Sequence, residues 1–198
     1  MKNQSKNGKD WTKLSDNEIV KLVIAQNQKA YQELIRRYQS KLFSYLYRLV
    51  RNREESEDLL QSVFLKVYKN IKSFNTQKNF SSWIYRIAHN EAVNFLKKKS
   101  KKHFISIEDI QNSKDKLEII DIQKNPIDSW IAKELKKEMN EALEKLPLKY
   151  KEALILRYYY DNSYEEMSKI LGKPVNTVGT LLNRAKKKLM EVMKERWK

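Results

Sequence analysis

Residues 163–189 read SYEEMSKILGKPVNTVGTLLNRAKKKL. Ser163 and Glu166 form the pattern of a capping box, so we expect a helix to begin directly after Ser163. Gly172 and Pro174 end this helix, and apolar residues then recur at three- and four-residue steps from Val178 onward. A short helix, a glycine turn and a longer helix make a helix-turn-helix, whose second helix enters the major groove of DNA. The stretch therefore predicts a helical, DNA-binding C-terminal unit.

The two helices of this motif are expected over residues 164–171 and from Asn176 to about Arg196. The first should turn four apolar side chains inward: Tyr164, Met167, Ile170 and Leu171. Polar and basic side chains occupy the outward positions of the second: Asn176, Thr177, Thr180, Asn183, Arg184 and Lys187. Amides and hydroxyls can bond to base edges or phosphates, and basic groups can pair with phosphate. The alternative is an ordinary helical hairpin, but basic residues on the exposed helix favour DNA binding.

The composition of the 198-residue chain agrees with this interpretation. A net charge of +16 favours a polyanionic partner, namely DNA, RNA or an acidic membrane face. Because only 3 glycines and 3 prolines are present, an all-α fold is expected rather than a sandwich or barrel. With no cysteine and 2 histidines, the chain should hold no disulfide and no metal. Residues 1–14 are predicted to be a disordered tail without a signal peptide, and no apolar run approaches the ~20 residues that span a bilayer, so we expect a cytoplasmic protein without membrane insertion.

Helical periodicity divides the chain into two small domains joined by an acidic linker. In the N-terminal domain, residues 15–102, helices are expected over about 16–26, 30–50, 54–72 and 82–99, the last capped by Ser81 or Ser82. Residues 73–80 break the periodicity and should form a loop. Residues 103–127 form the linker, where acidic residues outnumber basic ones. The C-terminal domain, residues 128–198, should contain helices ending near Leu146 and Tyr160, followed by the helix-turn-helix.

Further segments resemble bacterial sigma factors of the extracytoplasmic-function (ECF) group. Residues 58–68, DLLQSVFLKVY, resemble the signature helix of the family. Residues 80–90, FSSWIYRIAHN, resemble its promoter-melting and minus-ten-reading segment, and residues 143–147 with the helix-turn-helix resemble its minus-thirty-five-binding domain. The resemblance covers about residues 16–196. It implies that the chain binds core RNA polymerase and promoter DNA to direct transcription initiation, and that an anti-sigma factor regulates it.

The resemblance also assigns roles to individual residues of the N-terminal domain. The polymerase contact falls on Glu57, Asp58 and Gln61, although acids at this position can also favour a helix N-terminus. The minus-ten contacts fall on Asn75, Thr76, Lys78, Arg86, His89, Asn90 and Lys97. Phe74, Phe80 and Trp83 could stack on a flipped base, or Phe80 and Trp83 could simply be core anchors. A neutral, solvated His89 without a special role is an equal alternative.

Two other classes of protein remain as alternatives. An enzyme would need a metal cluster, a phosphate-binding glycine loop or an activated nucleophile, and the sequence offers none of these, so no catalytic residue, cofactor or small-molecule substrate is expected. A stand-alone operator-binding regulator would bind a palindrome as a dimer without polymerase, but no dimerisation heptads are evident. One departure from the family concerns Gly179 and Leu181, where recognition helices usually carry basic residues.

Overall fold

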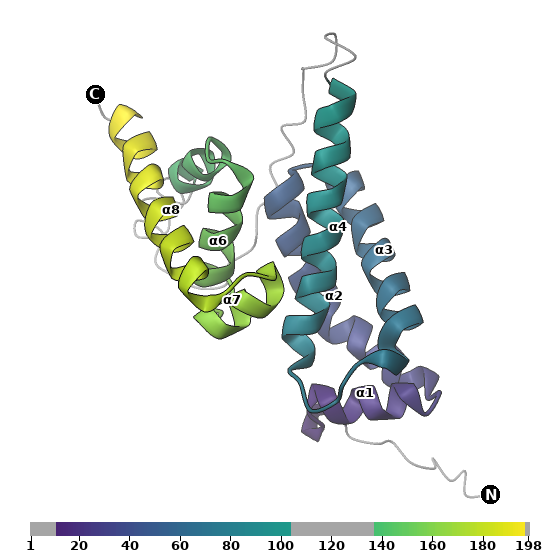
Figure 1. Ribbon diagram of the computed structural model, residues 1–198. Helices are drawn as coiled ribbons and strands as arrows, with labels where there is room; N and C mark the ends of the chain where they lie inside the picture. Colours follow the sequence, from purple (N-terminus) through teal and green to yellow (C-terminus); the bar gives the residue numbers. More distant parts are fainter. Residues whose placement is uncertain (1–10, 104–136, 197–198) are drawn as a thin grey trace, which may run out of the picture.

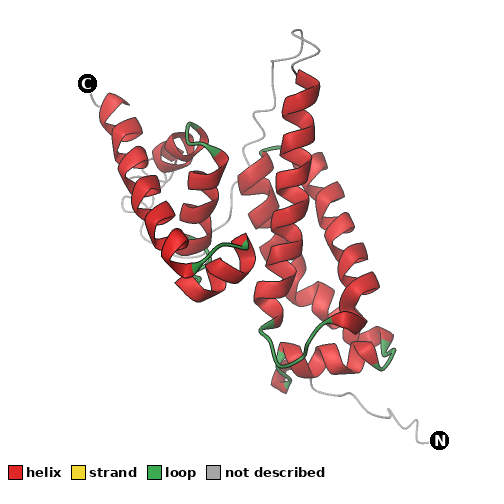
Figure 2. Cartoon of the chain, in the orientation of Figure 1, coloured by secondary structure: helices red, strands yellow, loops and turns green. Residues whose placement is uncertain are grey.

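The computed structural model describes residues 11–103 and 137–196, and these residues are helical with no strand among them. The N-terminal unit (residues 11–103) contains α1 (Asp16–Ile24), α2 (Gln28–Val50), α3 (Arg53–Asn70) and α4 (Phe80–His103), with short 3-10 turns at Trp11–Lys13 and Ile71–Ser73. The C-terminal unit (residues 137–196) contains a helical segment at 137–144, then α6 (Leu148–Tyr158), α7 (Tyr164–Leu171) and α8 (Val175–Arg196). Figures 1 and 2 show the two units side by side. The all-α fold is confirmed, while the predicted linker lies outside the described residues.

Local side chains explain where most helices begin and end. Ser15 caps α1 through a complete capping box with Glu18, as the sequence predicts. Asn52 caps α3 directly after Arg51, whose left-handed backbone (φ 60°) ends α2. The prediction that Ser81 or Ser82 caps α4 is wrong. The Oδ1 of Asn79 accepts the Ser82 backbone N–H at 3.0 Å instead, because α4 begins at Phe80 and its cap must precede it.

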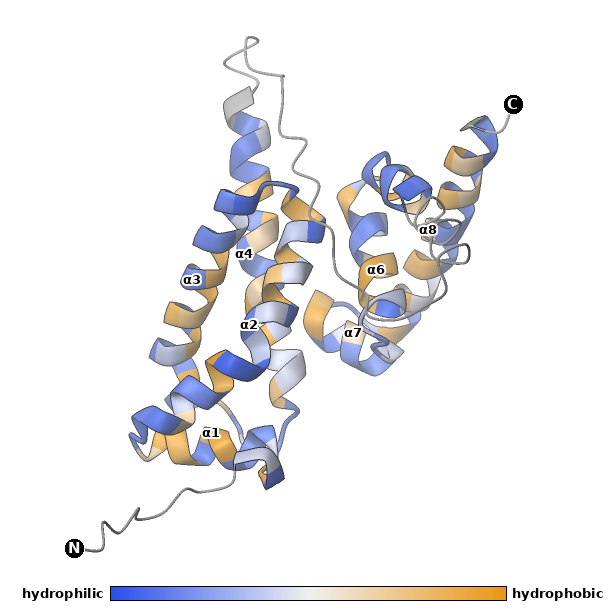
Figure 3. Cartoon of the chain, turned by 180° about the vertical axis from the view of Figure 1, so that it is seen from behind, coloured by the Kyte–Doolittle hydropathy of each residue, from blue (hydrophilic) through white to orange (hydrophobic). Residues whose placement is uncertain are grey.

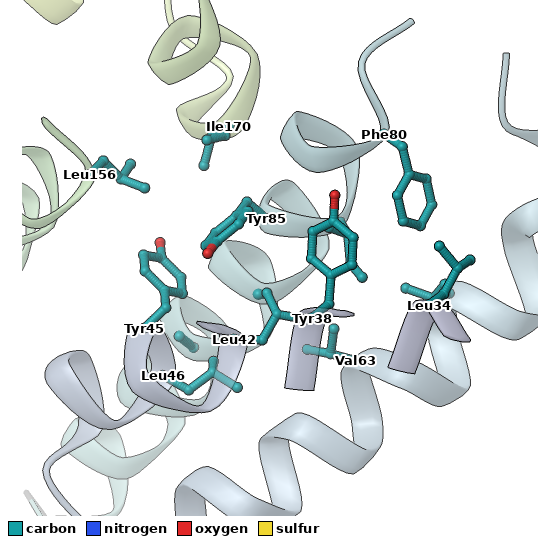
Figure 4. Close-up of a cluster of buried hydrophobic side chains, with 14 of the residues drawn as sticks. Leu34, Tyr38, Leu42, Tyr45, Leu46, Val63, Phe80, Tyr85, Leu156 and Ile170 are labelled. Atoms are coloured by element: carbon teal, nitrogen blue, oxygen red, sulfur yellow. The ribbon is translucent and has the colours of Figure 1, made fainter. Parts of the chain in front are cut away.

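A buried apolar cluster extends through both units. Figure 3 shows the hydrophobic residues, in orange, on the helices of each unit. In the N-terminal unit this cluster includes Leu34, Leu42 and Val63 from α2 and α3. It continues without a break into the C-terminal unit through Leu156 and Ile170, which Figure 4 shows near Tyr45 and Tyr85. A smaller cluster, centred on Leu143, Leu154 and Ala185, packs within the C-terminal unit alone. The shared cluster was not predicted, because the sequence was divided into two domains with separate cores.

A buried polar contact accompanies this packing between the units. The Tyr45 hydroxyl on α2 donates to the Glu152 carboxylate on α6 at 2.5 Å, and Nδ1 of His89 on α4 contacts the same oxygen. Burial, and then the nearby Glu152 charge, raises the pKa of Tyr45 well above its ordinary value, so the phenol remains a donor. The rings of Tyr45, Tyr85 and Tyr160 lie 5.4–5.8 Å apart around this contact. The C-terminal unit is therefore fixed on α2 and α4 by both apolar and polar contacts.

Candidate nucleic-acid interface

The predicted helix-turn-helix is present as α7, a tight turn and α8. Gly172 ends α7 with a left-handed backbone (φ 63°), a conformation that glycine adopts at least cost. The turn is tied to α7 because the Ser168 hydroxyl donates to the Lys173 carbonyl at 2.6 Å, and the Lys173 N–H donates back to the Ser168 carbonyl at 3.1 Å. These bonds fix the angle at which α8 leaves the turn.

The outward face of α8 is open to solvent as predicted. All the proposed upstream contacts are exposed: Asn176, Thr177, Thr180, Asn183, Arg184 and Lys187. The opposite face buries Val178, Leu182 and Ala185 completely. An exposed polar and basic face on a rigidly presented helix can enter a major groove.

The expected orientation of Tyr164 is wrong. Its side chain is 37% exposed rather than buried, and its ring lies beside Gly179 on α8. A Cβ at Gly179 would be in ordinary van der Waals contact with the Tyr164 ring at 3.6 Å, so the ring lies close to α8 at this position. Leu181 is half-buried and packs against the shared core, which explains an apolar residue at that position.

On α4, an exposed face contains several of the predicted minus-ten residues. Arg86, Asn90 and Lys97 are exposed, and their spacing of four and seven residues places them on one side of the helix. His89 points elsewhere, because its side chain is only 15% exposed and contacts Glu152 of α6. The interpretation of His89 as a solvated residue without a role is therefore wrong.

The loop between α3 and α4 holds the remaining minus-ten candidates. Asn75 and Lys78 are exposed and Thr76 is half-buried. The Asn17 side-chain amide on α1 donates to the backbone carbonyls of Thr76 and Lys78, both at 2.9 Å. The Asn75 carboxamide oxygen accepts the Gln77 N–H at 2.9 Å and so helps to shape the turn. Asn17 was missed by the sequence interpretation, since no local pattern links it to a loop some sixty residues away.

The aromatic residues around this loop form part of the core. Phe74 and Phe80 are buried, and Trp83 is partly buried against them. Their ring centroids lie 5.0–5.6 Å from one another, and Tyr38 meets Phe80 edge-on at 5.5 Å. The anchor interpretation therefore holds for Phe80 and Trp83. These rings form the part of the core against which the α3–α4 loop packs.

One face of α3 carries exposed acidic and apolar side chains. Glu57, Asp58 and Gln61 are exposed there, with Glu57 paired to Arg53 at 2.9 Å. Leu65 and Tyr68 lie on the same side of the helix and are 61% and 62% exposed. The sequence interpretation gave neither residue a role, because it placed the polymerase contact on Glu57, Asp58 and Gln61 alone. Exposed apolar residues beside acids are typical of a binding patch.

Other kinds of site find no support in the part of the chain that the structure describes. Residues 11–103 and 137–196 contain no group of three or more histidine, aspartate or glutamate side chains that could hold a metal ion. In the same ranges, no helix has the length and apolar character needed to cross a membrane.

Comparisons with known proteins identify the family of the chain. The model of Sigma-70 region 2 matches residues 34–102, and that of Sigma-70 region 4 matches residues 136–189. The chain is 32% identical over 176 residues to an ECF RNA polymerase sigma-E factor of Haemophilus influenzae, covering 87% of this chain and 92% of that protein. It is 30% identical over 178 residues to the ECF RNA polymerase sigma factor SigW of Bacillus subtilis, covering 89% and 95%.

Solved structures share the fold at lower identity. A structure of CnrH in complex with the cytosolic domain of CnrY matches with a TM-score of 0.67 at 18% identity, covering 91% of this chain and 97% of that one. The sigma factor RpoE in complex with the anti-sigma factor NepR from Bartonella quintana also gives 0.67, at 22% identity, covering 84% and 98%. The class of protein is thus a sigma factor with regions 2 and 4. The chain belongs to the ECF group of RNA polymerase sigma factors.

Proposed function

We propose that this sigma factor binds core RNA polymerase and directs it to promoters by reading DNA on two separate surfaces. The observation that carries the proposal is the occurrence, on one chain, of an exposed helix-turn-helix and a second exposed polar face on another helical unit. In this proposal α8 contacts the upstream duplex, while α4 and the α3–α4 loop contact the minus-ten strand. The separate matches to Sigma-70 region 2 and Sigma-70 region 4 support a division of the chain into two functional units.

The minus-ten surface is proposed to consist of Arg86, Asn90 and Lys97 together with the α3–α4 loop. Exposed amides in the loop can bond to the edge of an unstacked base, and the cations on α4 can pair with phosphates. His89 was assigned to this surface from the sequence. Because it contacts Glu152 in this structure, it could join the surface only after that contact opens.

The exposed face of α3 is proposed to bind the polymerase. Its acids would complement a basic protein surface, and Leu65 and Tyr68 would supply the apolar centre that stable interfaces contain. The domain limits proposed with it are residues 15–102 for the polymerase-binding and minus-ten unit and residues 128–198 for the upstream unit. We also propose an anti-sigma partner, since related structures were solved with such partners.

This role requires no catalysis by the chain itself, no cofactor and no small-molecule substrate. It would be carried out in the cytoplasm, where bacterial RNA polymerase acts. The operator-binding regulator is less well supported, because the region 2 match has no place in that class of protein.

Run-off transcription with bacterial core polymerase, with and without the full chain, tests the proposal. Discrete starts that require the protein are expected. The Lys187→Gln variant should weaken initiation by loss of a phosphate contact, whereas Lys188→Gln is the matched control, because Lys188 pairs with Glu191 at 2.9 Å on a different side of α8. Sequence-specific binding by the protein alone, without polymerase-dependent starts, would establish the operator-binding regulator instead.

A further inference from the structure

The groove-entering half of α8 has no charge on its exposed surface. From Val175 to Asn183 the exposed side chains are apolar, hydroxyl or amide groups: Val175, Asn176, Thr177, Thr180 and Asn183. The first cation of the helix is Arg184, and Lys186, Lys187 and Lys188 follow it. Because the N-terminal residues of a recognition helix reach the base edges, the bases would meet only neutral side chains.

The hydrogen bonds of this half define what each side chain can offer to a base. The Thr180 hydroxyl donates to the Asn176 backbone carbonyl at 3.0 Å, so its proton is used within the helix and its methyl group remains as an apolar contact. Among residues 11–103 and 137–196, no hydrogen bond engages the side-chain amides of Asn176 and Asn183, and both are exposed. The groups available to a base are therefore the amides of Asn176 and Asn183, the Thr177 hydroxyl and the Thr180 methyl group.

Positions 179 and 181 contribute no cation to this half of α8. The Tyr164 ring lies beside Gly179, where an added Cβ would be in ordinary van der Waals contact with it at 3.6 Å. The half-buried Leu181 is engaged with the core and cannot reach a base.

We propose that α8 reads adenine–thymine base pairs through Asn176 and Asn183, with the Thr180 methyl group against a thymine methyl, and does not select guanine. An asparagine amide pairs with N6 and N7 of adenine, and a methyl group packs on the thymine methyl, whereas guanine is selected chiefly by arginine or lysine. Arg184 and Lys187 would then bind phosphate and add affinity without sequence preference. The inference rests on the proposed function, since it specifies the DNA that this helix recognises.

The spacing of these residues adds a geometric expectation. Asn176, Thr180 and Asn183 are separated by four and three residues, so they line one side of the helix. Asn176 and Asn183 are about 10 Å apart along the axis, the length of about three base pairs. The two adenines should therefore stand about three positions apart, with the thymine contact between them.

The experiment is a selection from promoters with a randomised upstream element, transcribed by bacterial core polymerase with the full chain. Adenine should be enriched at two positions about three apart, without guanine at either. Asn183→Ala should remove discrimination at one of these positions only, by about 5- to 150-fold. Lys187→Gln is the comparison, because loss of a phosphate contact should weaken all sequences about equally.

Each outcome has a distinct meaning. Enrichment of guanine at the positions sensitive to Asn183, or an equal loss on every sequence in Asn183→Ala, would overturn the inference while leaving the sigma function intact. Asn183→Arg provides a second check, since it should convert the preference at its position from adenine to guanine. Absence of protein-dependent starts on every template would instead refute the proposed function itself.

Discussion

Replacing Tyr45 by phenylalanine removes one hydroxyl from the contact that joins the two units. That hydroxyl is fully buried and donates to the Glu152 carboxylate at 2.5 Å. Within residues 11–103 and 137–196, His89 is the other side chain that contacts this carboxylate. A hydrogen bond to a charged group contributes about 1.5–3 kcal/mol, and the loss leaves a buried carboxylate with one partner fewer. For a chain of this length, the loss corresponds to a lowering of Tm by about 3–12 °C.

Urea unfolding of the full chain, followed by circular dichroism, measures this difference in the free energy of unfolding. The matched control is Tyr68→Phe, because the Tyr68 side chain is 62% exposed on α3. The control should change the free energy by less than about 0.5 kcal/mol.

A double-mutant cycle then assigns the loss to the contact itself. Tyr45→Phe and Glu152→Ala should be non-additive by at least about 1 kcal/mol, since both changes remove the same hydrogen bond. Strict additivity, or a Tyr45→Phe variant as stable as the parent chain, would refute the reasoning that this buried contact fastens α6 to α2.

Three further predictions follow from individual side chains. Asn17→Ala removes both hydrogen bonds from α1 to the α3–α4 loop, so stability should fall by about 1–3 kcal/mol. Opening of the minus-ten region, measured by 2-aminopurine fluorescence, should also slow, while Gln39→Ala on the exposed surface of α2 should leave both quantities unchanged. Hydrogen bonds from Arg36 and then Arg37 lower the pKa of Glu33 from 4.5 to about 2, so their stabilisation of the fold is complete above pH 4.5 and is lost as the pH falls toward 2. In an acid titration, the free energy of unfolding of Glu33→Gln should therefore fall less steeply than that of the parent chain over this pH range. Burial lowers the pKa of Lys151 from 10.5 to about 8, so Lys151→Met should stabilise the chain by about 1–3 kcal/mol at pH 7. This advantage should shrink as the pH rises above 8, whereas equal stability of the two proteins at pH 7 would show that the buried ammonium is well compensated.

Local sequence patterns predicted the helices and most of their ends. Capping boxes at Ser15 and Ser163 act only on neighbouring backbone groups, so their effect can be inferred without tertiary structure. The exposed face of α8 followed from periodicity for the same reason. The start of α4 was predicted too late in the sequence, because Asn79 caps this helix in place of Ser81 or Ser82.

Contacts distant in the sequence were not predictable in this way. Nothing near His89 identifies Glu152 as its partner, and nothing near Asn17 identifies the α3–α4 loop. Tyr164 was predicted to be buried because its position matches the apolar stripe of α7. Its ring instead lies at the surface, beside Gly179 of α8. The functional roles of residues such as His89, whose contacts are distant in the sequence, therefore depend most on experiment.

The unbroken apolar cluster across α2, α4, α6 and α7 has a consequence for dissecting the protein into fragments. A recombinant fragment ending after α4 would expose Tyr45 and Tyr85 to water, and a fragment starting at α6 would expose Leu156 and Ile170. Newly bared apolar surface promotes self-association, so truncated halves should be prone to oligomerise or precipitate during purification. Before the DNA binding of either half is measured in isolation, the apolar surface exposed by the truncation would need polar substitutions.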